Sequence, residues 1–262
     1  MTTLCRGMTT AMPTTTITTI TTTTGRAIAT GRAVGMRTDI SPSVALMWLA
    51  SPALPVGGFS YSEGLEAAID HGLVHDEASC GAWLGDQLML TQARGDLAVV
   101  AQAIVAWRAM DEKRLAELAR WVVCTRESAE MRLQTEQMGR SMQDWMKNLG
   151  AAPEPALAVL GRLPPNYPLA QALALSVLDV SVEQALQAYA FGWAENMTQA
   201  ALKAVPLGQN SGQRLLAMLA QSIGPAVELA MHLTDDQRQA FSPMLAILSS
   251  RHEHQYSRLF RS

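Results

Sequence analysis

Histidines at short spacing are the residues in this chain that could most readily support metal chemistry. His71 and His75 are four residues apart, so a helix would place both imidazoles on one face, where they could share an ion. Gly72 lies between them and is expected to end the helix, which favours exposed helix-end histidines instead. His252 and His254 flank a glutamate, but a spacing of two divides a pair between helix faces. We therefore predict no metal ligands and a tail that is solvated or bound by a partner.

Paired glycines before a predicted helix start are the other candidate for a binding site, in this case one for an anion. Gly57 and Gly58 could cradle an anion at a helix N-terminus, or simply allow a tight turn that places Phe59 in the core. The tight turn is the preferred interpretation. The sequence has no GxSxG, HExxH, P-loop or dinucleotide-binding fingerprint. We predict no catalytic residue, and a protein that is not an enzyme.

The elements that must position these residues are all predicted to be helices. Apolar residues recur at helical spacing, and no alternating strands or hairpin turns are evident. Two S-x-x-E/Q patterns, Ser60–Glu63 and Ser181–Gln184, predict capping boxes, and Thr234–Gln237 predicts a cap for the last helix. The loop 51–58 and the proline-rich stretch 150–168 interrupt the pattern. Helices are expected at about 42–49, 60–71, 76–93, 96–109, 111–123, 126–149, 181–205, 209–222 and 225–233, with a last one bent by Pro243. The stretch 150–168 is expected to hold at most a short helix, and the apolar stretch 169–178 to be buried.

Composition limits the class of protein. The chain has 262 residues, 48% of them hydrophobic, a net charge of −3 and three widely separated cysteines without a CxxC pair. These values argue against a nucleic-acid binder, a disulfide framework and a zinc ribbon, and favour the cytoplasm. We find no run of about 18 apolar residues and predict no membrane span.

The first 38 residues differ from the rest. They are rich in threonine and carry four arginines and no acidic residue, which predicts a disordered extension over 1–38. A transit peptide and a true start at Met36 are the alternatives. The remainder predicts an all-α protein: a single compact multi-helix domain over 39–248, followed by a partner-binding C-terminal tail over 249–262.

Four stretches resemble one family. They are Leu49–Glu66 (LASPALPVGGFSYSEGLE), the helix around Glu127–Arg140 ending EMRLQTEQMGR, Ala200–Arg214 (AALKAVPLGQNSGQR) and the tail Ser250–Ser262 (SRHEHQYSRLFRS). In this order, over about 40–262, the chain resembles the urease accessory protein F (UreF) family.

The resemblance implies a cytoplasmic, all-helical homodimer without catalysis of its own. Such proteins bridge the scaffold UreD (UreH in some organisms) and the nickel-carrying GTPase UreG, and the assembly delivers nickel to apo-urease. Nickel would be handled by the complex, so no tightly bound cofactor is expected, nor nucleic acid or membrane as partner. The positions carried over as partner-binding are Gly57, Gly58, Tyr61, Glu63 and Glu66 in the first stretch, Lys203, Gln209, Gln213 and Arg214 in the third, and His252, Glu253, Tyr256, Arg258, Leu259 and Phe260 in the tail.

Two functional hypotheses follow. One is a scaffold that assembles the nickel-delivery complex, and the other is a direct regulator of GTP hydrolysis by UreG. We expect Glu66 and Lys203 to be solvated charges that matter for association and not for folding. We expect the tail to be mobile alone and to fold on UreD, the alternative being that Leu259 and Phe260 pack on the protein's own core.

Overall fold

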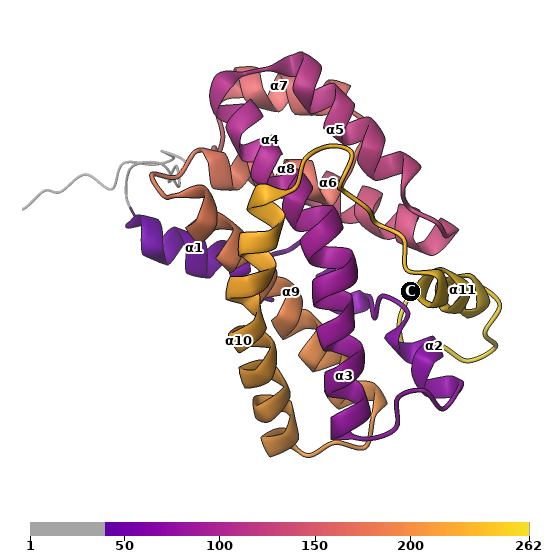
Figure 1. Ribbon diagram of the computed structural model, residues 1–262. Coiled ribbons are helices and arrows are strands. Elements are labelled where there is room, and N and C mark those ends of the chain that lie inside the picture. Colours follow the sequence, from indigo (N-terminus) through magenta and orange to yellow (C-terminus); the bar gives the residue numbers. More distant parts are fainter. Residues whose placement is uncertain (1–39, 262) are drawn as a thin grey trace, which may run out of the picture. The chain divides into compact units, whose positions relative to one another are not determined.

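The computed structural model describes residues 40–261, and the predicted disordered extension 1–38 lies outside them. The described part is all-helical, without a strand between residues 40 and 261, and belongs to one compact unit (Figure 1). The helices are α1 (Pro42–Ala50), η1 (Gly58–Ser60), α2 (Leu65–Asp70), α3 (Glu77–Gln87), η2 (Leu88–Asp96), α4 (Leu97–Ala109), α5 (Glu112–Cys124), α6 (Ala129–Leu149), α7 (Glu154–Arg162), α8 (Tyr167–Ser176), α9 (Val182–Ala204), α10 (Gln209–His232) and α11 (Pro243–His252).

Local capping chemistry sets several helix starts as predicted. Ser181 forms the predicted capping box with Gln184, because each side chain accepts from the other's backbone N–H. Ser41 caps α1, where Pro42 takes the first turn. Ser128 accepts from the Met131 N–H and starts α6 slightly later than predicted.

Two predicted caps are wrong. Ser60 does not cap a helix with Glu63: it ends the short η1, and α2 begins only at Leu65, after Glu63 (φ +51°) and Gly64 (φ +79°) reverse the chain. Thr234–Gln237 closes a turn on itself, since Thr234 Oγ1 donates to Asp236 and Gln237. The last helix begins instead at Pro243, which suits the first helical position and does not bend it.

Two predicted helix breaks are also wrong. Gly95 lies inside η2, a π-helical segment that joins α3 to α4 without interruption. A Cβ at this position would make only ordinary van der Waals contacts with Gln239 and Ala240, so the glycine neither breaks the helix nor is required by close packing. Pro225 lies within the continuous α10, which packs along α9; tertiary packing offsets the lost backbone hydrogen bond.

The core lies around α4, which packs against α8 on the one hand and against the paired helices α9 and α10 on the other. The stretch 169–178 is buried as predicted, within α8 and just beyond it, and α7 forms in the proline-rich connection. Helix α10 is long and apolar enough, by length and composition alone, to cross a membrane, as core helices often are. Helix α11 packs on α2 and the start of α6, and the chain then ends beside α2 (Figure 1).

Candidate partner-binding site

The first motif and the C-terminal tail, far apart in sequence, meet at the Glu66 carboxylate. Glu66 lies on α2 and is 7% exposed. Its oxygens accept hydrogen bonds from the Leu259 N–H at 2.7 Å and the Phe260 N–H at 3.0 Å, and His252 Nε2 lies 3.0 Å away. The carboxylate thus binds both the end of α11 and the backbone of the last residues.

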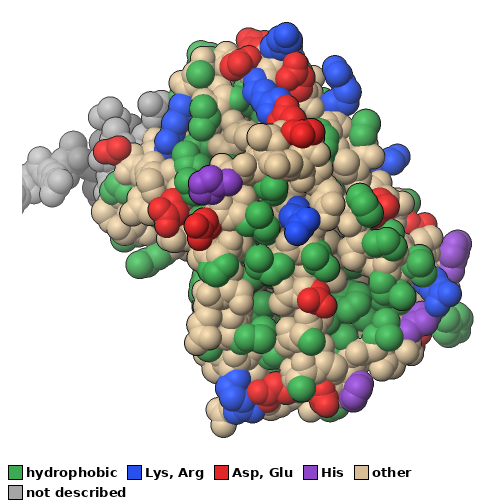
Figure 2. All heavy atoms as spheres, in the orientation of Figure 1, with side chains coloured by type: hydrophobic (Ala, Val, Ile, Leu, Met, Phe, Trp, Pro, Cys, Tyr) green, Lys and Arg blue, Asp and Glu red, His purple; other side chains and the backbone are tan. Residues whose placement is uncertain are grey.

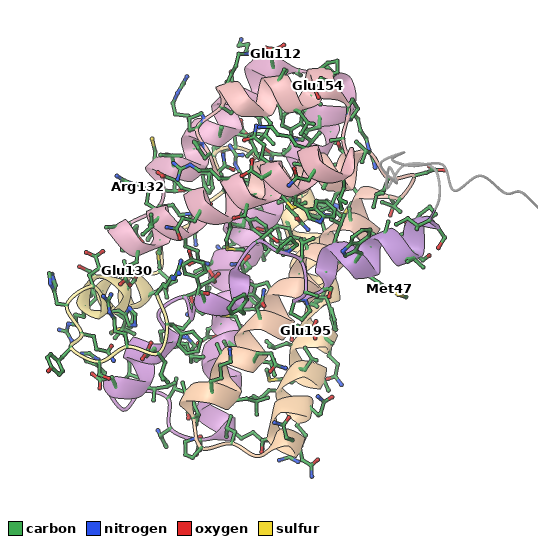
Figure 3. The ribbon with its side chains drawn as sticks, turned by 180° about the vertical axis from the view of Figure 1, so that it is seen from behind. Met47, Glu112, Glu130, Arg132, Glu154 and Glu195 are labelled. Carbon is green, nitrogen blue, oxygen red and sulfur yellow. The ribbon has the colours of Figure 1, made fainter. Side chains whose placement is uncertain are left out.

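A second buried carboxylate completes this network. Glu130, in the first turn of α6, has Oε2 2.8 Å from His252 Nδ1, and its Oε1 accepts from Arg258 at 2.8 Å. Glu253 accepts from the N–H of Ala129 at the start of the same helix. Figure 3 shows Glu130 where α6 meets α11. His252 is fully buried between two carboxylates, so hydrogen bonds and the Arg258–Glu130 ion pair both help to hold the tail.

Aromatic and cationic side chains lie beside the network. The Lys203 Nζ, at the end of α9, is 5.8 Å from the ring centroid of Phe260 and 5.9 Å from that of Phe59. The Arg261 N–H donates to the Ser60 carbonyl. One signature residue from the third stretch therefore joins the first motif and the tail.

Exposed apolar groups surround this junction. Tyr256 and Leu259 are 105% and 70% exposed, and Phe59 is 58% exposed instead of lying in the core as predicted. We call these three residues, with Lys203, the motif–tail surface. Figure 2 shows further hydrophobic side chains around α2 and α11. Met244, in the first turn of α11, is 50% exposed. Large exposed apolar side chains with neighbouring charges are typical of protein-binding surfaces.

Glu63 and the paired glycines of the first motif serve positions inside the fold. Glu63 Oε1 accepts from Gln134 and Oε2 from the Trp193 indole, each at 2.8 Å, and burial raises the pKa of this carboxyl group. Gly57 has φ +78°, a backbone conformation that favours glycine. A Cβ on Gly58 would lie 2.8 Å from the Asn196 side chain. The glycines thus form a tight turn against α9, as predicted from the sequence.

The remaining predicted positions lie elsewhere. Tyr61 is buried and its hydroxyl donates to Gln137 at 2.6 Å; burial raises the pKa of Tyr61, and a hydrogen bond with Arg261 counters the rise. Arg214 on α10 forms a two-pronged ion pair with Glu77 on α3, at 2.7 and 2.5 Å. This hydrogen bonding lowers the pKa of Glu77 to about 2. Gln209 and Gln213 are exposed at the start of α10.

Two expectations need correction. Glu66 is not a solvated charge: it is buried and holds two backbone N–H groups and an imidazole. The tail was expected to be mobile alone, but it is docked on the protein's own body. The alternative, that Leu259 and Phe260 pack on the core, is right for Phe260, which is 6% exposed, and wrong for Leu259, whose side chain is exposed. The predicted boundary at residue 249 falls within α11, because His252 anchors the helix end in the network.

Sequence reasoning missed Glu130 and the Asp96–Arg126 ion pair. Glu130 looks like one of several charges on a narrow-striped helix, and only its place in the first turn, two residues after Ser128, sets it apart. Arg126 binds both Asp96 oxygens at 2.8 Å, with both side chains largely buried. Arg126 and Asp96 are 30 residues apart, so no local pattern pairs them.

Comparison with known proteins identifies the family. The family model described as UreF matches residues 74–220. The chain is 62% identical over 220 residues to "Urease accessory protein UreF" of Paracidovorax citrulli (strain AAC00-1), covering 83% of this chain and 88% of that protein. It is 62% identical over 217 residues to the protein of that name from Polaromonas sp. (strain JS666 / ATCC BAA-500), covering 83% and 93%. A third, from Methylibium petroleiphilum (strain ATCC BAA-1232 / LMG 22953 / PM1), is 60% identical over 227 residues, covering 86% and 96%. The chain therefore belongs to the UreF family of urease accessory proteins.

Proposed function

We propose that this protein is a non-catalytic scaffold that bridges UreD (UreH) and the GTPase UreG and is required for nickel incorporation into apo-urease. It acts in the cytoplasm as a homodimer. Nickel is the cargo of the complex and not a resident cofactor of this chain. Family membership supports the role in urease maturation, since relatives about 60% identical carry that name.

The motif–tail surface is the observation that carries the bridging role. It joins three stretches of the chain: the first motif through Phe59, the end of α9 through Lys203, and the tail through Tyr256 and Leu259. The buried ionic network beneath it fixes the backbone of the tail before any partner binds. Preorganised aromatic and apolar anchors lower the entropy cost of association. We assign this surface to UreD, the partner expected from the family resemblance to take the tail.

The start of α10 is the candidate surface for UreG. Gln209, Gln213 and Arg214 present amide and guanidinium groups there, and Arg214 is already oriented by Glu77. A guanidinium held in a fixed geometry suits recognition of a carboxylate or phosphate on a partner. Two surfaces of different chemistry, one apolar and aromatic and one polar, are what a bridging protein needs.

Co-purification with separately tagged UreD and UreG tests this assignment. Tyr256→Ala together with Leu259→Ala should abolish capture by UreD while leaving the helical content unchanged. Leu133→Ala, which truncates a similarly exposed residue on α6, is the matched control and should bind normally. Equal capture of all these variants by UreD would overturn the assignment.

Direct regulation of UreG is the competing function, and the same proteins distinguish it. GTP hydrolysis by UreG should be measured with and without this protein, at concentrations that saturate binding. A scaffold leaves the turnover rate of UreG unchanged within about twofold. A rate increase of about 10³-fold or more, lost in an arginine variant such as Arg214→Ala, is the signature of an activating protein and would contradict the scaffold proposal.

A further inference from the structure

A cavity with a mixed lining of apolar and charged side chains lies beneath the loop that carries the first motif. Its volume is about 110 Å³, and its lining includes the end of α1, the following loop, η2, α6, α8 and α9. A buried water needs roughly 10–15 Å³ of such space, so the cavity has room for several. Cavities lined by apolar groups stay dry, whereas those lined by polar groups hold water.

Charged groups make this lining unusual for an interior. Asp96 and Arg126, the ion pair between η2 and the segment before α6, both line the cavity, and so does Glu63. Two carboxylates and one guanidinium leave one negative charge unbalanced whenever Glu63 is ionised. Burial raises the pKa of Glu63, but its two oxygens already accept from Trp193 and Gln134, an arrangement that suits the carboxylate form. Solvation from within the cavity would reconcile burial with charge.

An unpaired acceptor at the same cavity gives a second, independent indication. Gln171 on α8 is 2% exposed and also lines the cavity. Its Nε2 donates to the Leu49 carbonyl at 3.1 Å, which fixes the orientation of the amide. Its Oε1 has no hydrogen-bond partner in the protein. Buried acceptors in native proteins are normally paired, with ordered water if not with protein.

We propose that this cavity is a hydration site in which a cluster of ordered waters solvates Glu63 and the Asp96–Arg126 pair and reaches Gln171 Oε1. The class of ligand is a small hydrogen-bond donor, and water is the one that fits a lining of mixed charge. The waters support the loop 51–58 from below and so hold the first motif in place against α9. This role is independent of which partner the outer surface binds.

Crystallography of the wild-type protein with and without xenon under pressure tests the proposal. We expect discrete waters within hydrogen-bond distance of Glu63 and of Gln171 Oε1, and no xenon at this place, because xenon enters dry apolar cavities. Xenon in the cavity, a lining collapsed without water, or a larger bound molecule would each overturn it.

Water ¹⁷O relaxation dispersion in solution gives a second readout. Glu63→Leu should lower the number of long-lived internal waters by at least one. The matched control, Glu195→Leu, changes the same residue type to leucine on α9, outside the cavity lining, and should leave the number unchanged. If Glu63→Leu does not fold, Gln171→Leu should lower the number likewise. An unchanged number in each folded cavity variant would contradict the proposal.

Discussion

Replacing Glu66 with alanine should release the tail. The substitution removes an acceptor for the Leu259 and Phe260 N–H groups and leaves His252 facing Glu130 alone. Leaving three donors in a largely buried site without their acceptor costs about 3–5 kcal/mol, at roughly 1–3 kcal/mol for each unsatisfied group. The expected loss in the docking free energy of the tail is therefore about 3–5 kcal/mol, well above the ~0–1 kcal/mol of a solvated charge.

Hydrogen exchange of individual amides measures this loss directly. A loss of about 3 kcal/mol corresponds to roughly 100-fold faster exchange, since each 1.4 kcal/mol is a factor of ten. We expect that acceleration at the Leu259 and Phe260 amides, with the amides of α4 much less affected because the tail can undock as a unit. Glu66→Gln, which keeps one acceptor oxygen, should give an intermediate effect. The exposed Glu228→Ala is the control and should change nothing.

Exchange of the tail amides of Glu66→Ala at wild-type rates would contradict this prediction. That result would mean that Glu66 does not hold the tail, and that the expectation of a solvated charge was right. It would also remove the structural basis for a preformed motif–tail surface.

Three further predictions concern other parts of the fold. Glu77 should titrate near pH 2 by NMR, and its pKa should return toward the ordinary value of 4.5 in Arg214→Ala. Because the pKa of Glu77 is lowered in the folded state, the stabilisation by this ion pair is present above about pH 4.5 and is lost as the pH falls toward 2. The raised pKa of Glu63 has the opposite effect on stability: the free energy of unfolding of the wild type relative to Glu63→Gln should fall as the pH rises above 4.5. A difference in unfolding free energy between the two proteins that stays constant across pH, measured by chemical denaturation, would contradict this. Gly139→Ala should cost about 1–3 kcal/mol, because a Cβ there would lie 2.6 Å from the backbone of the residue that caps α8. A Cβ on Gly85 would have no such contact, so Gly85→Ala should stabilise α3 by about 0.5–1 kcal/mol. If the denaturation midpoints of Gly139→Ala and Gly85→Ala shift in the same direction, close packing at Gly139 is not the cause.

Local chemistry made most helices predictable. Serine caps, first-turn prolines and apolar periodicity depend on neighbours within a few residues, so the starts of α1 and α9 and the burial of α8 follow from the sequence. The same logic fails at Ser60 and Thr234, where the local pattern is present but a tighter turn satisfies the polar groups instead.

The candidate site was predictable in its residues but not in its geometry. The motif and tail positions were named by resemblance, yet nothing local pairs Glu66 with His252, which is 186 residues away. Charged residues are usually exposed, so the sequence alone favoured a solvated Glu66, and the buried network reversed that expectation. The exposed Tyr256 and Leu259 agree better with local reasoning, because a short polar tail buries few side chains.

Reconstitution of urease activation tests the scaffold role. Apo-urease, UreD, UreG, GTP and nickel should be combined with wild-type protein or with the Tyr256→Ala and Leu259→Ala double variant, and the nickel content of the urease and the composition of the captured complex measured together. We expect the wild type to join UreD to UreG and load nickel, and the double variant to stay folded but do neither. Nickel loading at the wild-type rate by a variant that no longer joins UreD to UreG would contradict the scaffold role.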